Sequence, residues 1–326
     1  MAKDLKIFIG SDPEFVFYSD DAATVHAAGP IVRSQKRISQ QWFGYDGTQG
    51  SSCAELRPPP ALTVSDFISG IKQAMAFGLK TFPRTSEYRW HAGTFCGGVW
   101  PIGGHLHVSC DRKDNSYVHQ LTSLLDMTVG IPFARIELPG ERLARLRANP
   151  GPEPYGGMGI YRNQKWGIEY RTPPSWLVSP MFASAAFAGA HLAAVSSRNL
   201  DIPRIDVDVS RQRRANANNN LLESWEVVAR YVRTLPDYDD YAKYLEPLYR
   251  MADRSERWQP LSEDMKDTWG LMSSPSVENH DADILEWSGI SSEIKRMDNH
   301  LSGIQIKDRL ESSYDPELLD WSEDYI

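Results

Sequence analysis

The sequence lacks the features that mark several common classes of protein. Its three cysteines, Cys53, Cys96 and Cys110, form no close CxxC pair, which disfavours a disulfide scaffold and a structural zinc site. The N-terminus shows no signal-peptide pattern. The longest weakly polar stretch, residues 181–195, is Ala-rich, contains His191 and is too short to span a bilayer, so it predicts a buried helix. We therefore expect a soluble cytoplasmic protein with no membrane partner.

Known motifs for nucleotides and catalytic metals are also missing. The sequence has no GxxxxGK(S/T) phosphate loop and no GxGxxG after a predicted strand. It also has no HExxH helix, and this absence argues against a zinc hydrolase. The net charge of −8 would repel a phosphate backbone at long range, so a nucleic-acid partner is disfavoured. Any nucleotide would therefore be held mainly by metal ions and arginines.

Short strand patterns alternate with helical patterns over the first two thirds of the chain. Strands are predicted at residues 5–18, 52–57, 103–110, 159–162 and 167–172, and helices at 63–80, 117–130 and 180–197. Residues 132–159, rich in Arg, Pro and Gly, are predicted to form a long loop. Because the pattern has no βαβ rhythm, it favours an α+β fold with an antiparallel sheet.

The sequence changes character after about residue 214. Helical patterns then dominate, at 221–235, 238–252 and 283–301, and the last sixteen residues carry six acids and no base. We predict a catalytic domain over residues 1–215 and a helical extension over 216–326 that packs on it. The extension either covers the outside of the catalytic domain or docks to a partner.

Four short strands each place two polar side chains on one face, because alternate residues of a strand point the same way. The pairs are Asp12 with Glu14, Glu55 with Arg57, His105 with His107, and Glu169 with Arg171. Taken singly, each pair could be a turn, a surface ion pair or a set of core donors. Together they would make one sheet face that is costly to bury. Hard cations would resolve the repulsion, since Mg²⁺ takes oxygen ligands, bridges to phosphates and less often accepts His.

The stretch between residues 132 and 171 is locally basic in an acidic chain. Its basic residues are Arg135, Arg142, Arg145, Arg147, Arg162, Lys165 and Arg171. This local charge fits an anionic ligand, and the alternative is a solvated charged loop.

These residues occur in runs that resemble a known family. The runs are GSDPEF at 10–15, ELRP at 55–58, GHLHVS at 104–109, YG at 155–156, YR at 161–162 and WGIEYRTP at 166–173. In this order they resemble the phage-type amidoligases, also called carboxylate–amine ligases of type 2, of the glutamine synthetase and glutamate–cysteine ligase superfamily. The combination is specific although no single run is, and the resemblance spans roughly residues 5 to 200.

The resemblance implies a fold, cofactors and ligand roles. The fold would be a curved antiparallel sheet that forms a funnel with helices outside, and the cofactors would be ATP with Mg²⁺ or Mn²⁺. Glu14 and Glu55 would hold the metal ion that organises the acceptor carboxylate, with Asp46 as a candidate to join them. The metal ion that bridges the ATP phosphates would be held by Asp12, His105 and Glu169. The superfamily usually has Glu at the position of Asp12, whose shorter arm would reach the metal directly or through water.

The resemblance also places the arginines. Arg171 would bind the β- and γ-phosphates of ATP, with Arg162 as a second candidate. His107 lies on the cofactor-binding face with its role open. The implied catalytic set is Glu14, Glu55, Glu169 and Arg171.

The implied reaction is amide-bond formation through an acyl phosphate, with the 132–159 segment as a lid that excludes water. The carboxylate and the amine could belong to small molecules, peptides or proteins. Three alternatives stay open: a guanidino-type phosphotransferase on the same fold, a catalytically idle phage structural or binding protein, and a metal-dependent hydrolase that uses His105 and His107. A phage-encoded chain would act in the host cytoplasm or associate with the virion, and the extension could contact a phage partner or a second copy.

Overall fold

The structure is a computed structural model that describes residues 6–19, 24–32, 42–46, 53–96, 100–110, 112, 114–148, 155–198, 220–258 and 264–271. The chain divides into two compact units, Met1–Ser274 and Pro275–Ile326, and all described residues lie in the first. The helix predicted at 283–301 and the acidic end of the chain therefore fall outside the described residues. None of the described helices is long and apolar enough to cross a membrane.

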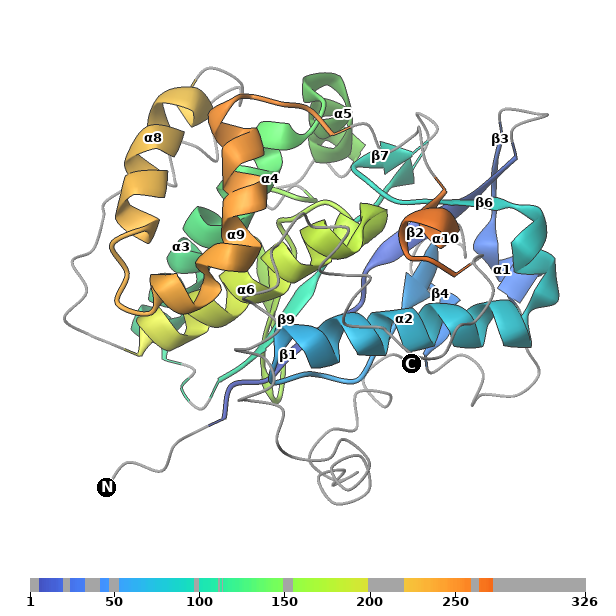
Figure 1. The fold of residues 1–326 in the computed structure, drawn as a ribbon, viewed down its shortest axis with the longest axis horizontal. Coiled ribbons are helices and arrows are strands. Elements are labelled where there is room, and N and C mark those ends of the chain that lie inside the picture. The colour runs from blue at the N-terminus through green and yellow to red at the C-terminus, as the bar shows by residue number, and fades with distance from the viewer. Residues whose placement is uncertain are drawn as a thin grey trace. The chain divides into compact units, whose positions relative to one another are not determined.

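Two antiparallel sheets carry the predicted strands (Figure 1). The first sheet has the order β1 (Ile9–Ser11), β9 (Leu106–Ser109), β11 (Gly167–Tyr170) and β10 (Tyr161–Asn163). The second sheet has the order β3 (Thr24–His26), β2 (Glu14–Ser19), β5 (Ala54–Leu56) and β4 (Phe43–Tyr45), with β6 (Arg89–His91) also paired to β2. A separate ribbon pairs β7 (Phe95–Cys96) with β8 (Trp100–Pro101). Every pairing between the described strands is antiparallel, so the predicted α+β class is confirmed.

The strand predicted at residues 5–18 is divided at Asp12 and Pro13. Its first part, β1, belongs to the first sheet, and its second part, β2, begins at Glu14 in the second sheet. Proline has no N–H to donate and keeps the preceding residue extended, so it suits a point where a chain leaves one sheet for another. The carbonyl of Pro13 still accepts from Leu56 N at 3.1 Å. The division places Asp12 and Glu14 where the two sheets meet.

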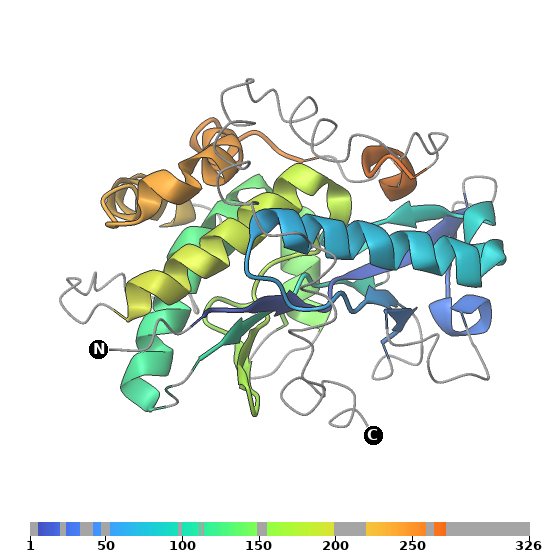
Figure 2. The same cartoon turned by 60° about the horizontal axis from the view of Figure 1, so that its bottom comes forward.

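Two long helices cover the sheets on one side (Figure 2). They are α2 (Val64–Thr81), which packs against β4 and β5, and α6 (Pro180–Ser197), which packs against β1 and β9. α6 is buried on nearly every side, as its Ala-rich sequence predicted. α3 (Asn115–Leu125) packs on α6 and continues through the π-helical turn η3 (Asp126–Gly130) into α4 (Ile131–Ile136). The helices predicted at 63–80, 117–130 and 180–197 are thus present.

The prediction of a long loop over residues 132–159 is wrong for residues up to Ala148. These residues form most of α4 and all of α5 (Pro139–Ala148). In α5 the buried positions are Arg142 and Arg145, whereas Leu143 is exposed. Because the charged stripe faces inward, apolar periodicity could not reveal this helix. A lid made of the whole segment is excluded, since both arginines are packed in the interior.

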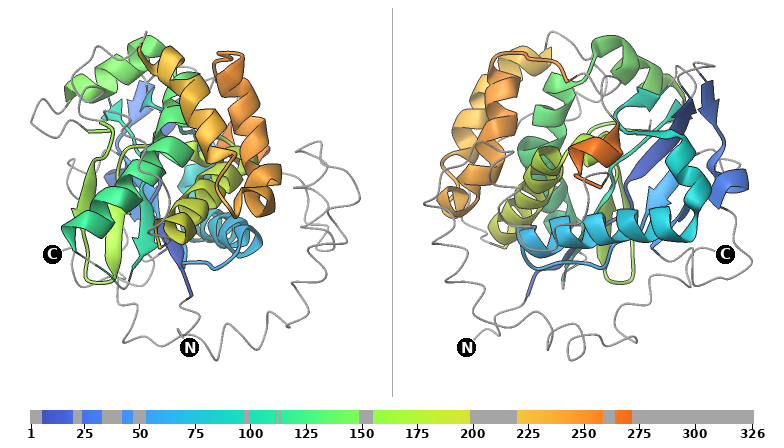
Figure 3. Two further views of the ribbon diagram at one scale, coloured as in Figure 1. Left: turned by 90° about the vertical axis from the view of Figure 1, so that its left-hand side faces the viewer. Right: turned by 45° about the vertical axis from the view of Figure 1, so that its right-hand side comes forward.

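Two further helices, α8 (Asn220–Val232) and α9 (Tyr238–Asp253), lie side by side, with α9 packed on α6 and α8 packed on α4 and η3 (Figure 3). Their buried apolar residues recur at helical spacing and include Trp225, Val228, Val232, Leu245 and Leu248. Both helices belong to the same compact unit as the sheets. The shorter elements are α1 (Ala28–Val32), η2 (Pro83–Glu87), η4 (Trp176–Val178) and α10 (Met265–Thr268), the last of which packs against β6.

Candidate active site

Three polar side chains form one row across the first sheet. Arg162 on β10 lies opposite Glu169 on β11, and Glu169 lies opposite His107 on β9. Residues that face each other directly in an antiparallel pair share one side of the sheet. The alternation seen in the sequence therefore brings Arg162, Glu169 and His107 to the same face, as expected.

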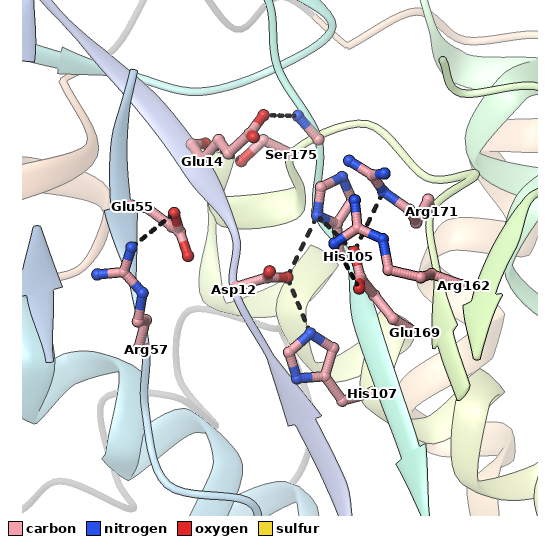
Figure 4. Close-up of polar contacts among 12 residues, drawn as sticks. Asp12, Glu14, Glu55, Arg57, His105, His107, Arg162, Glu169, Arg171 and Ser175 are labelled. Atoms are coloured by element: carbon pink, nitrogen blue, oxygen red, sulfur yellow. Dashed lines mark hydrogen bonds and ion pairs between the residues drawn. The ribbon is translucent and has the colours of Figure 1, made fainter. Parts of the chain in front are cut away.

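Asp12 lies in front of this row and joins it to His105 (Figure 4). Nδ1 of His105 is 3.3 Å from Oδ1 of Asp12 and 3.7 Å from Oε1 of Glu169. Nε2 of His107 is 3.1 Å from the same oxygen of Asp12. One ligand atom each from Asp12, His105 and Glu169 lies within 4.8 Å of the other two. We call these three residues the Asp12 cluster.

Glu14 and Glu55 form the second acidic pair. They lie directly opposite each other on β2 and β5. Oε2 of Glu14 accepts from Gly103 N at 2.7 Å and from the hydroxyl of Tyr155 at 2.8 Å. Oε2 of Glu55 accepts from Nη2 of Arg57 at 2.9 Å. The two carboxylates are therefore side by side, each with a hydrogen-bond donor of its own.

The acidic residues do not line a single sheet face, so that expectation is wrong. Glu14 and Glu55 belong to the second sheet, whereas Glu169 and the histidines belong to the first sheet or its edge. Figure 4 shows Glu55 and Arg57 on one side of Asp12, with Glu169 and Arg171 on the other. The cause is the break at Pro13, which turns the chain from one sheet into the other.

Burial and neighbouring charges shift the pKa values of the acidic and histidine side chains in the site. It raises the pKa of Glu14 and raises that of Glu55 well above its ordinary range, and in both cases nearby Asp46 adds to the rise. Burial would also raise the pKa of Asp12, but His107 and His105 hold it well below its ordinary value. Burial would lower the pKa of His105, yet Asp12 raises it. The site is thus an acidic group whose charge the protein itself only partly balances.

Two arginines border the Asp12 cluster. Nε of Arg171 lies 3.1 Å from Oε1 of Glu169, and Nη1 of Arg162 lies 3.3 Å from Oε2 of the same carboxylate. The side chain of Arg171 is 25 % exposed and that of Arg162 is 45 % exposed. Glu169 raises the pKa of Arg171 although burial opposes the rise, so this guanidinium is permanently charged. Both arginines can therefore reach an anion in front of the cluster.

Three other arginines expected near an anionic ligand instead hold the scaffold together. Nη1 of Arg142 donates to Oε2 of Glu137 at 2.7 Å. Arg145 donates to two backbone carbonyls, at 3.1 and 2.7 Å, and Arg135 donates to the carbonyl of the penultimate residue of α9. Each is buried, so the expectation of an anion-binding role for these three is wrong.

Four contributors to the site were not assigned from the sequence. Tyr155 contacts both Glu14 and His105, and Gln164 donates to Oε2 of Glu169 at 2.9 Å. The hydroxyl of Ser175 donates to the backbone carbonyl of Glu14 at 2.5 Å, and Gly103 supplies the N–H described above. Tyr155 stands in one of the family-like runs, which was a signal. Ser175 and Gly103 contact Glu14, which is distant in sequence, and Gln164 is near Glu169 in sequence but stands in no run of the resemblance.

The donor set fits a hard divalent cation. The Asp12 cluster offers two carboxylates and one imidazole, and Glu14 and Glu55 add two carboxylates nearby. Oxygen-rich sets of this kind suit Mg²⁺ and Mn²⁺, whereas zinc sites favour Cys and His. The residues present are therefore compatible with the implied metal ions.

Comparison with known proteins points to one family. The sequence matches the model of the family described as "Phage phiEco32-like COOH.NH2 ligase-type 2" over residues 9–271. A search of curated protein sequences gives no significant match. Similar solved structures include the complex between the prokaryotic ubiquitin-like protein Pup and its ligase PafA, at 10 % identity and a TM-score of 0.49, covering 96 % of this chain and 71 % of that one. A bifunctional glutathione synthetase from Pasteurella multocida follows at 9 % identity and a TM-score of 0.39, covering 76 % and 48 %. Both TM-scores lie below 0.5, so the family match carries the assignment.

Proposed function

The chain belongs to the phage phiEco32-like COOH.NH2 ligases of type 2, and from this premise we propose that it joins a carboxylate to an amine with ATP and Mg²⁺, through an acyl phosphate. The resemblance noted in the sequence is confirmed by the family match, and the chain is a ligase. The observation that best supports the proposed use of ATP and Mg²⁺ is the Asp12 cluster, in which two buried carboxylates and an imidazole converge within 4.8 Å.

The residues of the site divide between two cations in this proposal. Asp12, His105 and Glu169 would hold the cation nearest the ATP phosphates, and Glu14 with Glu55 would hold the cation nearest the acceptor carboxylate. When bound, such cations neutralise phosphate charge and polarise the oxygens of the reacting groups. The raised pKa values of Glu14 and Glu55 support the division, because two buried carboxylates side by side favour an external positive charge.

Arg171 and Arg162 bind the phosphates in this proposal. Glu169 holds Arg171 through Nε, so the contact leaves the outer edge of the guanidinium directed away from that carboxylate. A planar guanidinium can grip two phosphate oxygens at once. Arg162 is the more exposed of the two and would close the rim of the site on the same anion.

The proposed reaction has two balanced steps. A carboxylate oxygen of the substrate attacks the γ-phosphorus of ATP, the bond to the β–γ bridging oxygen breaks, and ADP leaves. The amine nitrogen then attacks the acyl carbon, the bond to the phosphate oxygen breaks, and inorganic phosphate and one proton are released. The protein contributes position and charge, which suits the burial of the acidic groups and the restraint of Arg171.

A hydroxylamine trap tests this proposal without knowledge of the natural amine. The purified chain is incubated with ATP, Mg²⁺, hydroxylamine and a panel of carboxylates, and ADP and acyl hydroxamate are both measured. We expect hydroxamate in step with ADP for at least one carboxylate, and none from Glu169→Gln. ADP released without hydroxamate in the presence of a guanidino compound would instead indicate a phosphotransferase. Turnover without ATP would indicate a hydrolase.

A further inference from the structure

Tyr155 contacts both halves of the candidate site with one hydroxyl group. The hydroxyl lies 2.8 Å from Oε2 of Glu14 and 2.9 Å from Nε2 of His105. Glu14 belongs to the second sheet, and His105 immediately precedes β9 of the first. The Tyr155 side chain is buried, so these contacts are made away from solvent.

The groups around the Tyr155 hydroxyl determine which of its two hydrogen bonds it donates and which it accepts. Oε2 of Glu14 already accepts from the backbone N–H of Gly103 at 2.7 Å, and it also accepts the single proton of the Tyr155 hydroxyl. The oxygen of Tyr155 can then only accept from His105, which places a hydrogen on Nε2. Nδ1 is left as the ring nitrogen that faces Asp12 at 3.3 Å and Glu169 at 3.7 Å. That nitrogen is the one positioned for a cation in the Asp12 cluster.

The loop that carries Tyr155 is held at several points. Gly156 has a φ of 79°, and a Cβ there would lie 2.5 Å from the guanidinium of Arg145. The hydroxyl of Thr172 donates to Gly157 O at 2.7 Å, and Gly159 N donates to a carboxylate of η3 at 2.7 Å. Restraint at Gly156, Gly157 and Gly159 fixes the backbone beside Tyr155, as preorganised positioning residues require.

The ring of Tyr155 is held as firmly as its loop. The guanidinium of Arg145 lies 5.1 Å from the ring centroid and that of Arg171 lies 5.5 Å from it. A Cβ at Gly103 would come within 2.5 Å of both Nε2 of His105 and the hydroxyl of Tyr155, so only glycine allows this close approach. The hydroxyl therefore has little freedom to leave its two partners.

We propose that Tyr155 is a positioning residue that keeps the hydrogen of His105 on Nε2 and so presents Nδ1 to a cation held with Asp12 and Glu169. The same hydroxyl ties the orientation of that ring to Glu14, which couples the two proposed cation sites. This inference rests on the proposed function, because it assumes that the Asp12 cluster binds a divalent ion. Partners that hold the second nitrogen of a metal-bound histidine commonly fix its tautomer and ring orientation.

The test compares Tyr155→Phe with Tyr249→Phe. Both substitutions delete one buried hydroxyl and keep the ring, but the hydroxyl of Tyr249 donates to Thr128 O at 3.1 Å, and Tyr249 is no part of the site. Binding of Mn²⁺ alone to the full chain is measured by electron paramagnetic resonance. We expect Tyr155→Phe to weaken Mn²⁺ binding by about 10- to 100-fold, and Tyr249→Phe to leave it unchanged. Equal Mn²⁺ affinity in the wild type and Tyr155→Phe would overturn the inference.

A second readout separates positioning from simple packing. In the Mg²⁺-bound wild type, ¹⁵N-detected spectra of the histidine rings should show His105 protonated at Nε2 and not at Nδ1. Protonation at Nδ1 would overturn the inference even if Tyr155→Phe proved unstable. Failure of the proposed function would give a different result. The wild type and Asp12→Asn would then bind Mn²⁺ equally weakly.

Discussion

Two buried charged regions of the molecule look alike in composition and differ in how their charges are balanced. At the scaffold region in α4 and α5, Glu137 is matched by Arg142 at 2.7 Å, with Arg145 3.7 Å away. At the candidate site, four carboxylates gather around two histidines, and the pKa values of Glu14 and Glu55 are raised. Buried charges that the protein pairs for itself support a structure, whereas a buried excess of one sign calls for an external ion.

The largest effect that this comparison predicts is on catalysis. Glu14→Gln should lower ligase turnover by at least about 1000-fold, because loss of a proposed cation ligand should exceed the effect of losing an outer partner. The amide oxygen can still accept from Gly103 and Tyr155, so the fold should survive. A carboxyl with a raised folded-state pKa costs stability once the pH exceeds its unfolded value, so the metal-free variant should melt no lower than the wild type at pH 7.

The outcome that would contradict this is a fall of many degrees in the melting temperature of metal-free Glu14→Gln. Glu14 would then be a structural acid like Glu137, and the comparison would lose its basis.

Neutralising the acid of the scaffold region should lower the stability of the protein and leave its nucleotide affinity unchanged. Glu137→Gln leaves Arg142 and Arg145 buried without their acidic partner, which should cost about 3 kcal/mol of unfolding free energy. Urea unfolding monitored by circular dichroism measures the loss. Once the variant is folded at low temperature, its affinity for Mg²⁺-ATP should match that of the wild type. Normal stability with impaired nucleotide binding would move Glu137 from the scaffold to the site.

Two buried histidines, His191 and His105, have pKa values shifted in opposite directions, and this difference predicts how stability depends on pH. Burial lowers the pKa of His191 on α6 to about 4, whereas Asp12 raises that of His105. Nδ1 of His191 and the hydroxyl of Tyr241 on α9 are 2.7 Å apart. Because the unfolded chain binds the proton first, stability should be lost as the pH falls from about 6.5 to about 4, by about 3 kcal/mol for this group.

His191→Gln provides the measurement for this pH effect. It should flatten the dependence of the unfolding free energy on pH across that window, while the wild type and Tyr249→Phe keep the full slope. An unchanged slope in His191→Gln would show that this histidine has the same pKa in the folded and the unfolded chain.

The smallest difference is predicted between two variants at the site. Arg171→Lys should bind ATP almost as poorly as Arg171→Ala, with the two within about 1 kcal/mol, because a point charge does not replace a planar fork. Arg147, which is exposed on α5, offers a matched control, since Arg147→Lys should have no effect. Wild-type KM for ATP in Arg171→Lys would place Arg171 outside the phosphate site.

Several features of the site could be predicted from the sequence because they depend on local alternation. His105 with His107, and Glu169 with Arg171, are two residues apart, and the strands β9 and β11 bring His107 and Glu169 into register. The position of Glu14 could not be predicted in the same way, since Pro13 sends it into another sheet. Helix α5 was missed because it buries arginines, and Tyr155 was left without a role because its partners are 50 and 141 residues away.

The boundary predicted at residue 215 remains a proposal. α9 packs on α6 and buries Leu245 and Leu248, and α8 packs on α9 and α4, so a chain that ends at residue 215 would expose the outer side of α6. We propose that such a truncate aggregates. A soluble truncate that binds ATP normally would show that these helices form a separate domain.

We propose that this buried acidic group holds divalent cations beneath the ATP phosphates. Calorimetric titration of the full chain with ATP, in Mg²⁺ and then in excess chelator, tests it most directly, with Asp12→Asn as the paired variant. We expect measurable ATP binding by the wild type in Mg²⁺, and a loss of at least about 100-fold in affinity both in chelator and in Asp12→Asn. Equal ATP affinity with and without the metal would contradict it.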